Sequence, residues 1–239
     1  MLNRTRPGGR HGARRGIRSR QRGISMTEMM IGVTIGLIVL SGTLALFSGH
    51  LRSNGDMLRT TRLNNELRGT LDLVVRDLRR ASYWGTAVKG VWFPGTVAIE
   101  SNPFSEIAVG TGEVTYRYDV DGDGAYDNDE TFRIRRNGTD GTVELLQLDT
   151  GGGVTSTLPL SDGELTNITA LTFVMNDRTT SFACLKAGAG PVAPTPPVLH
   201  VREITVTLTG QLRADPTVTR TLTEAVRVRN DMTEGSCPS

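Results

Sequence analysis

The chain has 239 residues and a mass of 25.8 kDa, which is enough for one substantial globular core and an additional segment. Its net charge of +2 hides an uneven distribution, because eight of the 27 basic residues are arginines within residues 1–23, where there is no Asp or Glu. The remaining 19 basic residues face 25 acidic ones, so residues 24–239 carry a net charge of −6. The basic N-terminal run holds no aromatic residue that could stack on a base, so the composition does not predict direct nucleic-acid binding.

An apolar segment follows at residues 24–47, in which Glu28 is the one ionisable side chain. As a helix, a segment of this length would measure about 36 Å, enough to cross a hydrocarbon core of about 30 Å. The arginines before it would hold its N-terminal end in the cytoplasm and leave the C-terminal part outside. A secretory signal has a shorter apolar region, of about 7–15 residues, followed by a small-residue cleavage site. We therefore expect this segment to stay in the mature protein as a single membrane anchor.

The residues around Glu28 carry a family resemblance. The run Gln21-Arg22-Gly23-Ile24-Ser25-Met26-Thr27-Glu28-Met29-Met30 resembles the prepilin processing site of type IV pilins and type II secretion pseudopilins. The resemblance implies that a prepilin peptidase removes the leader, residues 1–23, by cutting after Gly23. Ile24, where Phe is usual, would become the methylated N-terminus, and Glu28 would guide assembly into a fibre. A purely structural explanation of Glu28 stands beside this one, because a carboxylate in the first turn of a helix suits the helix dipole.

Beyond residue 50 the hydrophobic pattern becomes amphipathic. Apolar residues recur three or four positions apart with charged residues between them, which predicts a helix with one apolar face. The apolar positions are Leu67, Leu71, Val74, Leu78 and Ala81, extended less regularly by Leu58 and Leu63. One helix would then run from residue 24 to residue 82, and a membrane helix followed by a separate packing helix is the alternative that Gly55 permits. In either case the apolar face needs a partner surface, which the rest of the chain would supply.

Two further motifs narrow the resemblance. Residues 76–85 (Arg-Asp-Leu-Arg-Arg-Ala-Ser-Tyr-Trp-Gly) are similar to the end of the stalk helix in minor pilins of the PilW type, and residues 226–230 (Val-Arg-Val-Arg-Asn) are similar to their last strand. The resemblance implies a minor subunit that helps to initiate or cap a type IV pilus. Its partners would be other minor and major pilins and the assembly platform of the bacterial inner membrane. Its head would lie in the periplasm and, after assembly, at the cell surface.

The expected fold class is α+β: a long N-terminal helix packed against a C-terminal antiparallel β-sheet head. Residues 24–50 would form the membrane half of the helix, residues 51–84 its amphipathic half, and residues 85–239 the head. Alternation of apolar residues with threonines predicts half-buried strands, most clearly around Ile204. The predicted strands are Val88–Phe93, Thr96–Glu100, Glu113–Tyr118, Thr131–Arg135, Thr142–Leu148, Leu165–Met175, Val201–Leu208 and Val218–Val228.

One stretch of the head has the pattern of a calcium-binding loop. Residues 119–130 match D-x-D-x-D-G-x₅-E at every required position, with Gly124 at the sharp turn. The oxygen ligands would be Asp119, Asp121, Asp123, the carbonyl of Ala125, Asp127 through a water molecule, and Glu130. Six carboxylates with no basic residue among them would repel one another unless a cation lay between them. The flanking residues are predicted strands, so an acidic hairpin tip with Asp-Gly turns is the alternative to one calcium site.

The two cysteines, Cys184 and Cys237, are too few for a zinc site and enough for one disulfide. Because an exported domain would be exposed to oxidising conditions, we expect them to be paired.

Catalysis has little support in the sequence. The three histidines lie far apart, and neither a nucleophile elbow nor a phosphate-binding loop is present. We therefore expect a structural protein with no enzymatic activity and no organic cofactor. Two other functions stay open, namely a type II secretion pseudopilin and a single-pass calcium-binding surface module that does not assemble.

Overall fold

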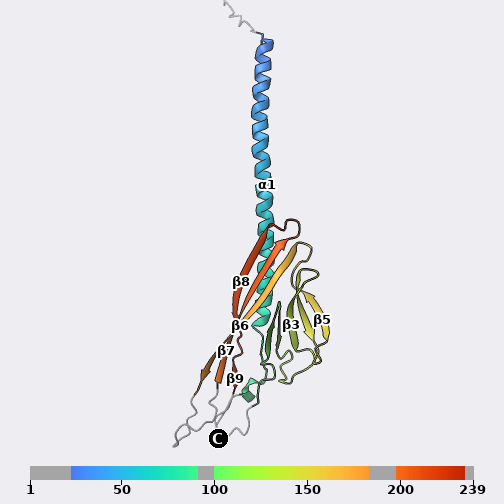
Figure 1. Ribbon diagram of the computed structural model, residues 1–239, viewed down its shortest axis with the longest axis vertical. Helices are drawn as coiled ribbons and strands as arrows, with labels where there is room; N and C mark the ends of the chain where they lie inside the picture. The colour runs from blue at the N-terminus through green and yellow to red at the C-terminus, as the bar shows by residue number, and fades with distance from the viewer. Residues whose placement is uncertain (1–22, 91–99, 183–197, 235–239) are drawn as a thin grey trace, which may run out of the picture. The chain divides into compact units, whose positions relative to one another are not determined.

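The computed structural model describes residues 23–90, 100–182 and 198–234. The chain divides into two compact units, Met1–Asn54 and Gly55–Ser239, and each is described by itself. The order of the helices and strands can be followed in Figure 1. The α+β class is confirmed, because one long helix is followed by two antiparallel sheets.

Helix α1 (Met26–Leu78) is continuous, so of the two alternatives the single helix is correct. A glycine inside a helix costs only about 1 kcal/mol relative to alanine, which is too little for Gly55 to break it. The helix ends four residues earlier than expected, because residues 79–82 form turns.

In the first unit, the N-terminal part of α1 is long and apolar enough to cross a membrane, by length and composition. Its apolar side chains have no partner within the described part of this unit: residues 23–54 are exposed or nearly so, and Leu46 is 71% exposed. Such a surface is stable in lipid or against other apolar helices, and unstable in water.

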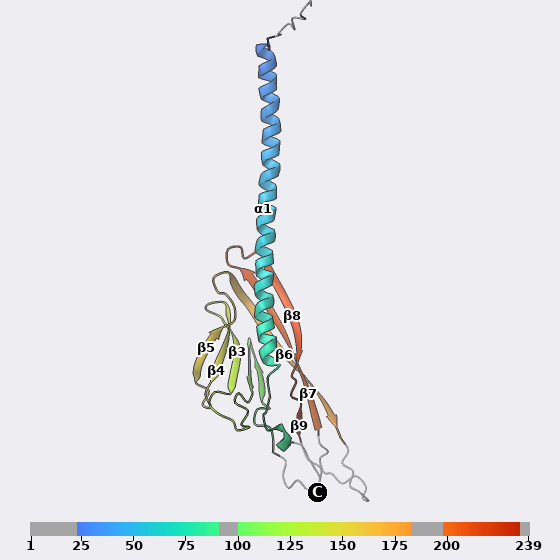
Figure 2. The ribbon, with the colours of Figure 1, turned by 180° about the vertical axis from the view of Figure 1, so that it is seen from behind.

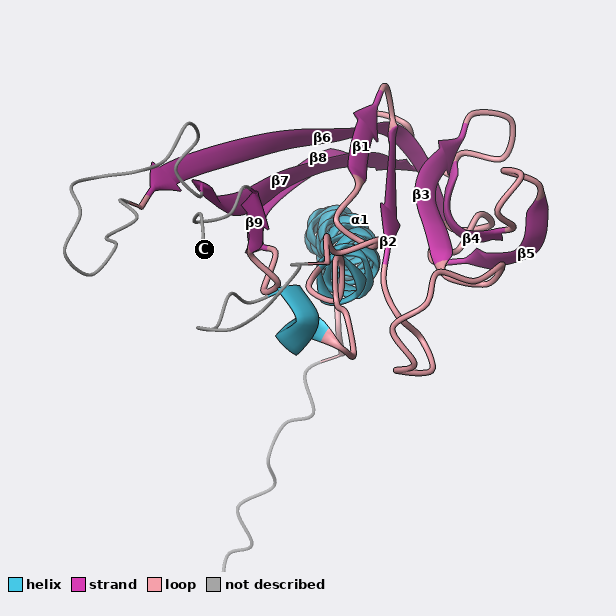
Figure 3. Cartoon of the chain, turned by 90° about the horizontal axis from the view of Figure 1, so that it is seen from below, coloured by secondary structure: helices cyan, strands magenta, loops and turns pink. Residues whose placement is uncertain are grey.

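In the second unit, α1 presents one buried face to the sheets. The buried positions are Leu63, Leu67, Thr70, Leu71, Val74, Val75 and Leu78. Leu63 thus belongs to the predicted apolar face, whereas Leu58 is 62% exposed and does not. Figure 3 views α1 end-on and shows it on one side of the sheet that contains β6.

The first sheet has five antiparallel strands in sequence order. They are β1 (Ile107–Gly110), β2 (Glu113–Arg117), β3 (Thr131–Asn137), β4 (Thr142–Leu148) and β5 (Val154–Pro159). The second sheet has the order β6-β7-β8, with β9 pairing the start of β7. Its strands are β6 (Thr166–Ser181), β7 (Val198–Leu212), β8 (Thr219–Arg227) and β9 (Met232–Glu234). Figure 2 shows both sheets from the side of α1.

The predicted strand at Val88–Phe93 is wrong in its described part, which is the 3-10 helix η1 (Ala87–Gly90). Two local hydrogen bonds form these turns: Ala87 N donates to the carbonyl of Trp84 (3.2 Å), and Lys89 N donates to that of Thr86 (2.9 Å). The predicted strand Thr96–Glu100 lies outside the described residues except for Glu100, which is not in a strand. Strands β1, β5 and β9 were not predicted.

Strand β7 forms the centre of the surface that receives α1. Every second residue from Arg202 to Leu212 is buried, and the hydrophobic ones join the core shared by the helix and both sheets. Gly210 occupies one of these inward positions. A Cβ atom there would lie 2.8 Å from Cδ2 of Leu67, so a larger residue would displace the Leu67 side chain or the helix.

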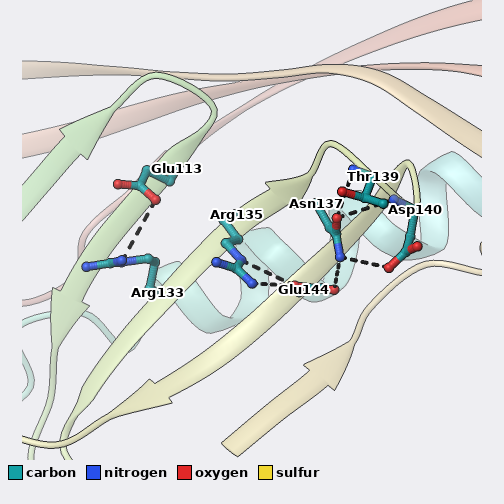
Figure 4. Close-up of polar contacts among 7 residues, drawn as sticks. All are labelled: Glu113, Arg133, Arg135, Asn137, Thr139, Asp140 and Glu144. Carbon is teal, nitrogen blue, oxygen red and sulfur yellow. Dashed lines mark hydrogen bonds and ion pairs between the residues drawn. The ribbon is translucent and has the colours of Figure 1, made fainter. Parts of the chain in front are cut away.

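The five-stranded sheet carries a ladder of polar side chains across β2, β3 and β4 (Figure 4). Arg135 donates from Nε and an Nη atom to Glu144 at 3.2 Å each, and Glu144 also accepts from Asn137 at 2.8 Å. Arg133 lies 4.0 Å from Glu113 on the neighbouring strand. These cross-strand pairs help to fix the register of the three strands.

We predict that Leu67→Ala lowers the free energy of unfolding of the Gly55–Ser239 unit by about 2–5 kcal/mol, because it leaves a cavity at a fully buried position. Leu73→Ala on the same helix is the matched control. Leu73 is 42% exposed, so its loss should be under about 1 kcal/mol. Urea unfolding followed by circular dichroism measures both. Equal losses would contradict the assignment of the buried face.

Candidate functional site

The residues of the processing motif lie at the start of α1. Gly23 and Ile24 precede the helix, and Ile24 is 80% exposed. The carbonyl of Ser25 accepts a hydrogen bond from Met29 N (3.1 Å), which closes the first turn. Glu28 lies in that turn, where its charge suits the positive end of the helix dipole. The peptide bond after Gly23 is thus outside the helix, and Glu28 is near the resulting end.

The calcium-loop pattern lies between β2 and β3, and its first carboxylate is almost fully buried. Asp119 is 2% exposed. Its Oδ1 accepts from Gly122 N (2.6 Å), and its Oδ2 accepts from Gly85 N and Gly124 N (2.9 Å each). Hydrogen bonds to the ionised form offset the cost of burying this charge. Asp119 therefore stabilises the loop by hydrogen bonds within it and also binds the segment that follows α1.

Glu130, the last residue of the pattern, holds the other end of the loop. It is 1% exposed, and its two oxygens accept from Val120 N and Asp127 N at 2.8 Å each. The pKa of this carboxyl is raised above its ordinary value, chiefly by burial. The two backbone donors act in the opposite direction, and the neighbouring charges of Asp119 and Asp121 add to the rise.

The carboxylates of Asp121 and Asp123 are exposed. One oxygen of each lies with one oxygen of Asp119 in a group whose members are all within 4.8 Å of one another. Oδ1 of Asp121 accepts from Asp123 N (3.1 Å), and Oδ1 of Asp123 accepts from Ala125 N (2.7 Å). The structure thus brings together three of the predicted ligands. Asp127 and Glu130 are not in this group, and Glu130 would have to share oxygens that already accept backbone N–H groups.

The loop is held against the segment that follows α1, so two separately noted motifs meet. Asp119 N donates to the carbonyl of Tyr83 (3.0 Å), and Nε1 of Trp84 donates to that of Gly124 (3.1 Å). Gly85 faces the loop so closely that a Cβ atom would lie 2.5 Å from the carbonyl oxygen of Gly122. This contact explains the glycine at the end of the Ser-Tyr-Trp-Gly run.

The C-terminal motif reaches the same junction. Nδ2 of Asn230 donates to the carbonyl of Ala81 (3.0 Å), and Nδ2 of Asn102 donates to the carbonyl of Ser82 (3.0 Å). Both carbonyls lie just after α1, where the chain would otherwise leave acceptors unpaired. Ser82 has a positive φ of 63°, which turns the chain out of the helical path.

Arg202 is the residue of this junction that sequence reasoning missed. It is 5% exposed and donates to the hydroxyl of Ser82 (2.9 Å), to the carbonyl of Asn230 (3.2 Å) and to that of Ser105. Burial lowers the pKa of its guanidinium, against the opposing effect of the Asp177 and Asp231 carboxylates. The alternation along β7 indicates that Arg202 is buried, because it lies two residues before Ile204 and therefore on the same, inward-facing side of the strand.

Cys184 and Cys237 lie outside the described residues, so their disulfide stays a prediction.

Comparison with known proteins decides the family. The prokaryotic N-terminal methylation motif matches residues 18–44, and the family described as prepilin peptidase-dependent protein B matches residues 56–228, more than half of the chain. The chain belongs to the prepilin peptidase-dependent protein B family. Neither the curated proteins nor the solved structures gave a match. This prepilin peptidase-dependent protein is therefore type IV pilin-like, and its exposed apolar helix fits a membrane anchor.

For this pilin-like head we predict that Asp119→Ala lowers the free energy of unfolding by about 2–4 kcal/mol, because backbone N–H groups at the junction lose their acceptor. Asp123→Ala, at an exposed position of the same loop, should cost under about 1 kcal/mol. Urea unfolding with a chelator present separates this effect from any metal. A loss at Asp123 as large as that at Asp119 would contradict the structural role given to Asp119.

Proposed function

We propose that this prepilin peptidase-dependent protein is a minor subunit of a type IV pilus, of the PilW type, that helps to initiate or cap the fibre. Its role would be structural and non-catalytic. The observation that carries the proposal is the methylation motif followed by an apolar helix surface with Glu28 in its first turn. The prepilin peptidase, other minor and major pilins and the inner-membrane assembly platform would be its partners. The arginine-rich N-terminal side favours a head in the periplasm.

Assembly would depend on a charge pair between subunits. Cutting after Gly23 creates an amine on Ile24, and a methylated amine can keep its positive charge. Glu28 of one subunit would pair with the N-terminus of another. At the apolar edge of a bilayer such a pair is screened less than in water, and either charge left alone is costly. Two subunits would then associate preferentially at one relative position along the fibre axis. The charge pair would thus fix the register of the subunits as well as strengthen their binding.

A type II secretion pseudopilin is the second candidate, because the methylation motif and the apolar helix serve both systems equally well. The proteins that co-purify with the assembled chain distinguish the two: pilus subunits support the first candidate and secretion-channel components the second.

We predict that Glu28→Gln leaves cleavage after Gly23 and membrane insertion unchanged and abolishes entry into the fibre, because it removes the charge while keeping the shape. Asp56→Asn, on the same helix, is the matched control and should assemble normally. Mass spectrometry of the N-terminus measures processing, and the amount of the chain in sheared fibres measures assembly.

Three outcomes separate the alternatives for this chain. Assembly of Glu28→Gln at the wild-type level would refute the charge-pairing mechanism alone. An intact arginine-rich N-terminus on the wild-type chain would refute the assignment as a processed subunit. A processed chain that joins neither fibre nor secretion complex would support the non-assembling surface module.

We further propose that the loop at residues 119–130 binds one calcium ion. The grouped oxygens of Asp119, Asp121 and Asp123 support this proposal, with the carbonyl of Ala125 as a further ligand. Three like charges this close repel one another in the absence of a cation. Because Asp119 and Glu130 already accept backbone N–H groups, the loop would be largely ordered before the ion binds.

We predict one calcium site by titration calorimetry on the Gly55–Ser239 unit, lost in the Asp121→Ala, Asp123→Ala double variant. Both side chains are exposed, so the double variant should keep the fold and lose only ligands. Asp129→Ala, in the same loop but outside the proposed ligand set, should bind like the wild type. Absence of heat and of any change in melting temperature at millimolar calcium would leave the acidic hairpin tip as the explanation.

A further inference from the structure

The edges of the two sheets differ in how well they are protected against pairing with another chain. An unprotected edge strand offers unpaired N–H and C=O groups, and proteins usually blunt it with shortness, proline or charge. Edge strand β1 has four residues, β5 ends at Pro159, and β8 carries Arg220, Glu224 and Arg227. Edge strand β6 has 16 residues, contains no proline and has one Asp and one Arg near its C-terminal end.

Among the described residues, only the first part of β6 has hydrogen-bond partners along the edge that faces away from β7. Ile168 N donates to the carbonyl of Gly141 (2.7 Å), and Nε of Arg136 donates to that of Ile168 (2.6 Å). From Ala170 to Ser181 the strand pairs with β7 on one side, and no other described strand pairs with it. Because alternate residues of a strand direct their backbone groups to opposite sides, half of this stretch has groups without a described partner.

A groove of about 580 Å³ lies beside this edge. It is lined by the β1–β2 turn at Gly110–Gly112, by residues 169–174 of β6 and by Arg136. Val174 is 55% exposed and Val109, next to the turn, is 37% exposed. No carboxylate lies within 4.0 Å of Arg136 in the described part of the chain. The edge thus combines apolar side chains, a cation and backbone groups that have no partner among the described residues.

We propose that residues 170–181 of β6 receive an extended strand from a neighbouring prepilin-type subunit. An extended segment is the conformation whose backbone groups match an open strand edge, as in recognition by strand addition. The bound strand would place an apolar side chain against Val174 and a carboxylate opposite Arg136. The proposal rests on the proposed function and adds the surface through which the head contacts its neighbour.

A different subunit fits this edge better than a second copy of β6. The one carboxylate of β6, Asp177, lies 2.7 Å from Nδ1 of His200 on its own sheet. A second β6 would therefore bring no free carboxylate to Arg136.

The first test places the photo-crosslinker p-benzoylphenylalanine at position 174 of the full-length chain, in membranes that also contain the other prepilin-type subunits. The matched position is 158 on edge strand β5, because Leu158 is 56% exposed and Val174 55%. We expect cross-linking to another subunit at least about tenfold stronger from position 174, with the site mapped by mass spectrometry to an extended segment. Equal yields from both positions, a helical target segment or a dimer of this chain would overturn the proposal.

The second test compares Val174→Lys with Leu158→Lys in fibre assembly. We expect Val174→Lys to reduce incorporation at least tenfold and Leu158→Lys to assemble normally, with equal melting temperatures showing that both variants fold. Normal assembly of Val174→Lys would overturn the β6 interface and leave the pilus assignment intact. A wild-type chain that does not assemble would overturn both.

Discussion

The fold of the head depends on one apolar face of α1, between Leu63 and Leu78, which is buried by both sheets. A helix in water gains little from its own hydrogen bonds, so this burial is what fixes the position of the helix within its unit. The face requires inward-facing apolar residues on β7 and a glycine at 210, where a side chain would collide with Leu67. The sheets in turn need the helix, because their inner faces would otherwise be exposed to water.

The end of that helix poses a second problem, because the polar groups of the buried residues just after it, Ala81 and Ser82, need hydrogen-bond partners. The protein solves it with side chains from distant segments: Asn102, Arg202 and Asn230. Asp119 adds a carboxylate that accepts backbone N–H groups from both sides of the junction. The helix end, the acidic loop and the segment between β8 and β9 therefore form one polar network, and the short motifs recognised separately in the sequence are parts of it.

The sequence predicted the features that depend on local pattern. The processing motif and the apolar length are properties of consecutive residues, and the spacing of the buried leucines and the alternation around Ile204 follow the periods of a helix and a strand. It did not predict β1 or β5, because these edge strands are short and carry little apolar alternation. The strand expected from Val88 is absent from its described part, because Lys89 and Gly90 have low β-propensity and local turn hydrogen bonds form there.

The acidic loop shows a different limit of sequence reasoning. Its pattern fits a calcium loop at every position, but the same residues also serve the fold. Asp119 and Glu130 are buried and accept backbone N–H groups, whereas Asp121 and Asp123 are exposed. A linear pattern gives the ligand types and their spacing, and it does not tell which oxygens are already used. Four of the donors to these oxygens belong to the loop itself, and the fifth, Gly85 N, comes from the segment after α1, so the pairing depends on the folded loop and not on a local period.

Glu28 and Asp119 pose the same electrostatic problem in two settings, and the difference explains why we assign them different roles. A carboxylate away from bulk water needs donors or a cation. Asp119 obtains its donors within its own unit, from three backbone N–H groups, so its charge stabilises a fold. Glu28 lies in the first turn of a helix whose neighbouring side chains are apolar and exposed, and no side-chain partner for it occurs among residues 23–54. Under the proposed processing, the nearest countercharge for Glu28 would be an Ile24 amine, either its own or that of a neighbouring subunit, and pairing with the neighbour's amine would favour assembly.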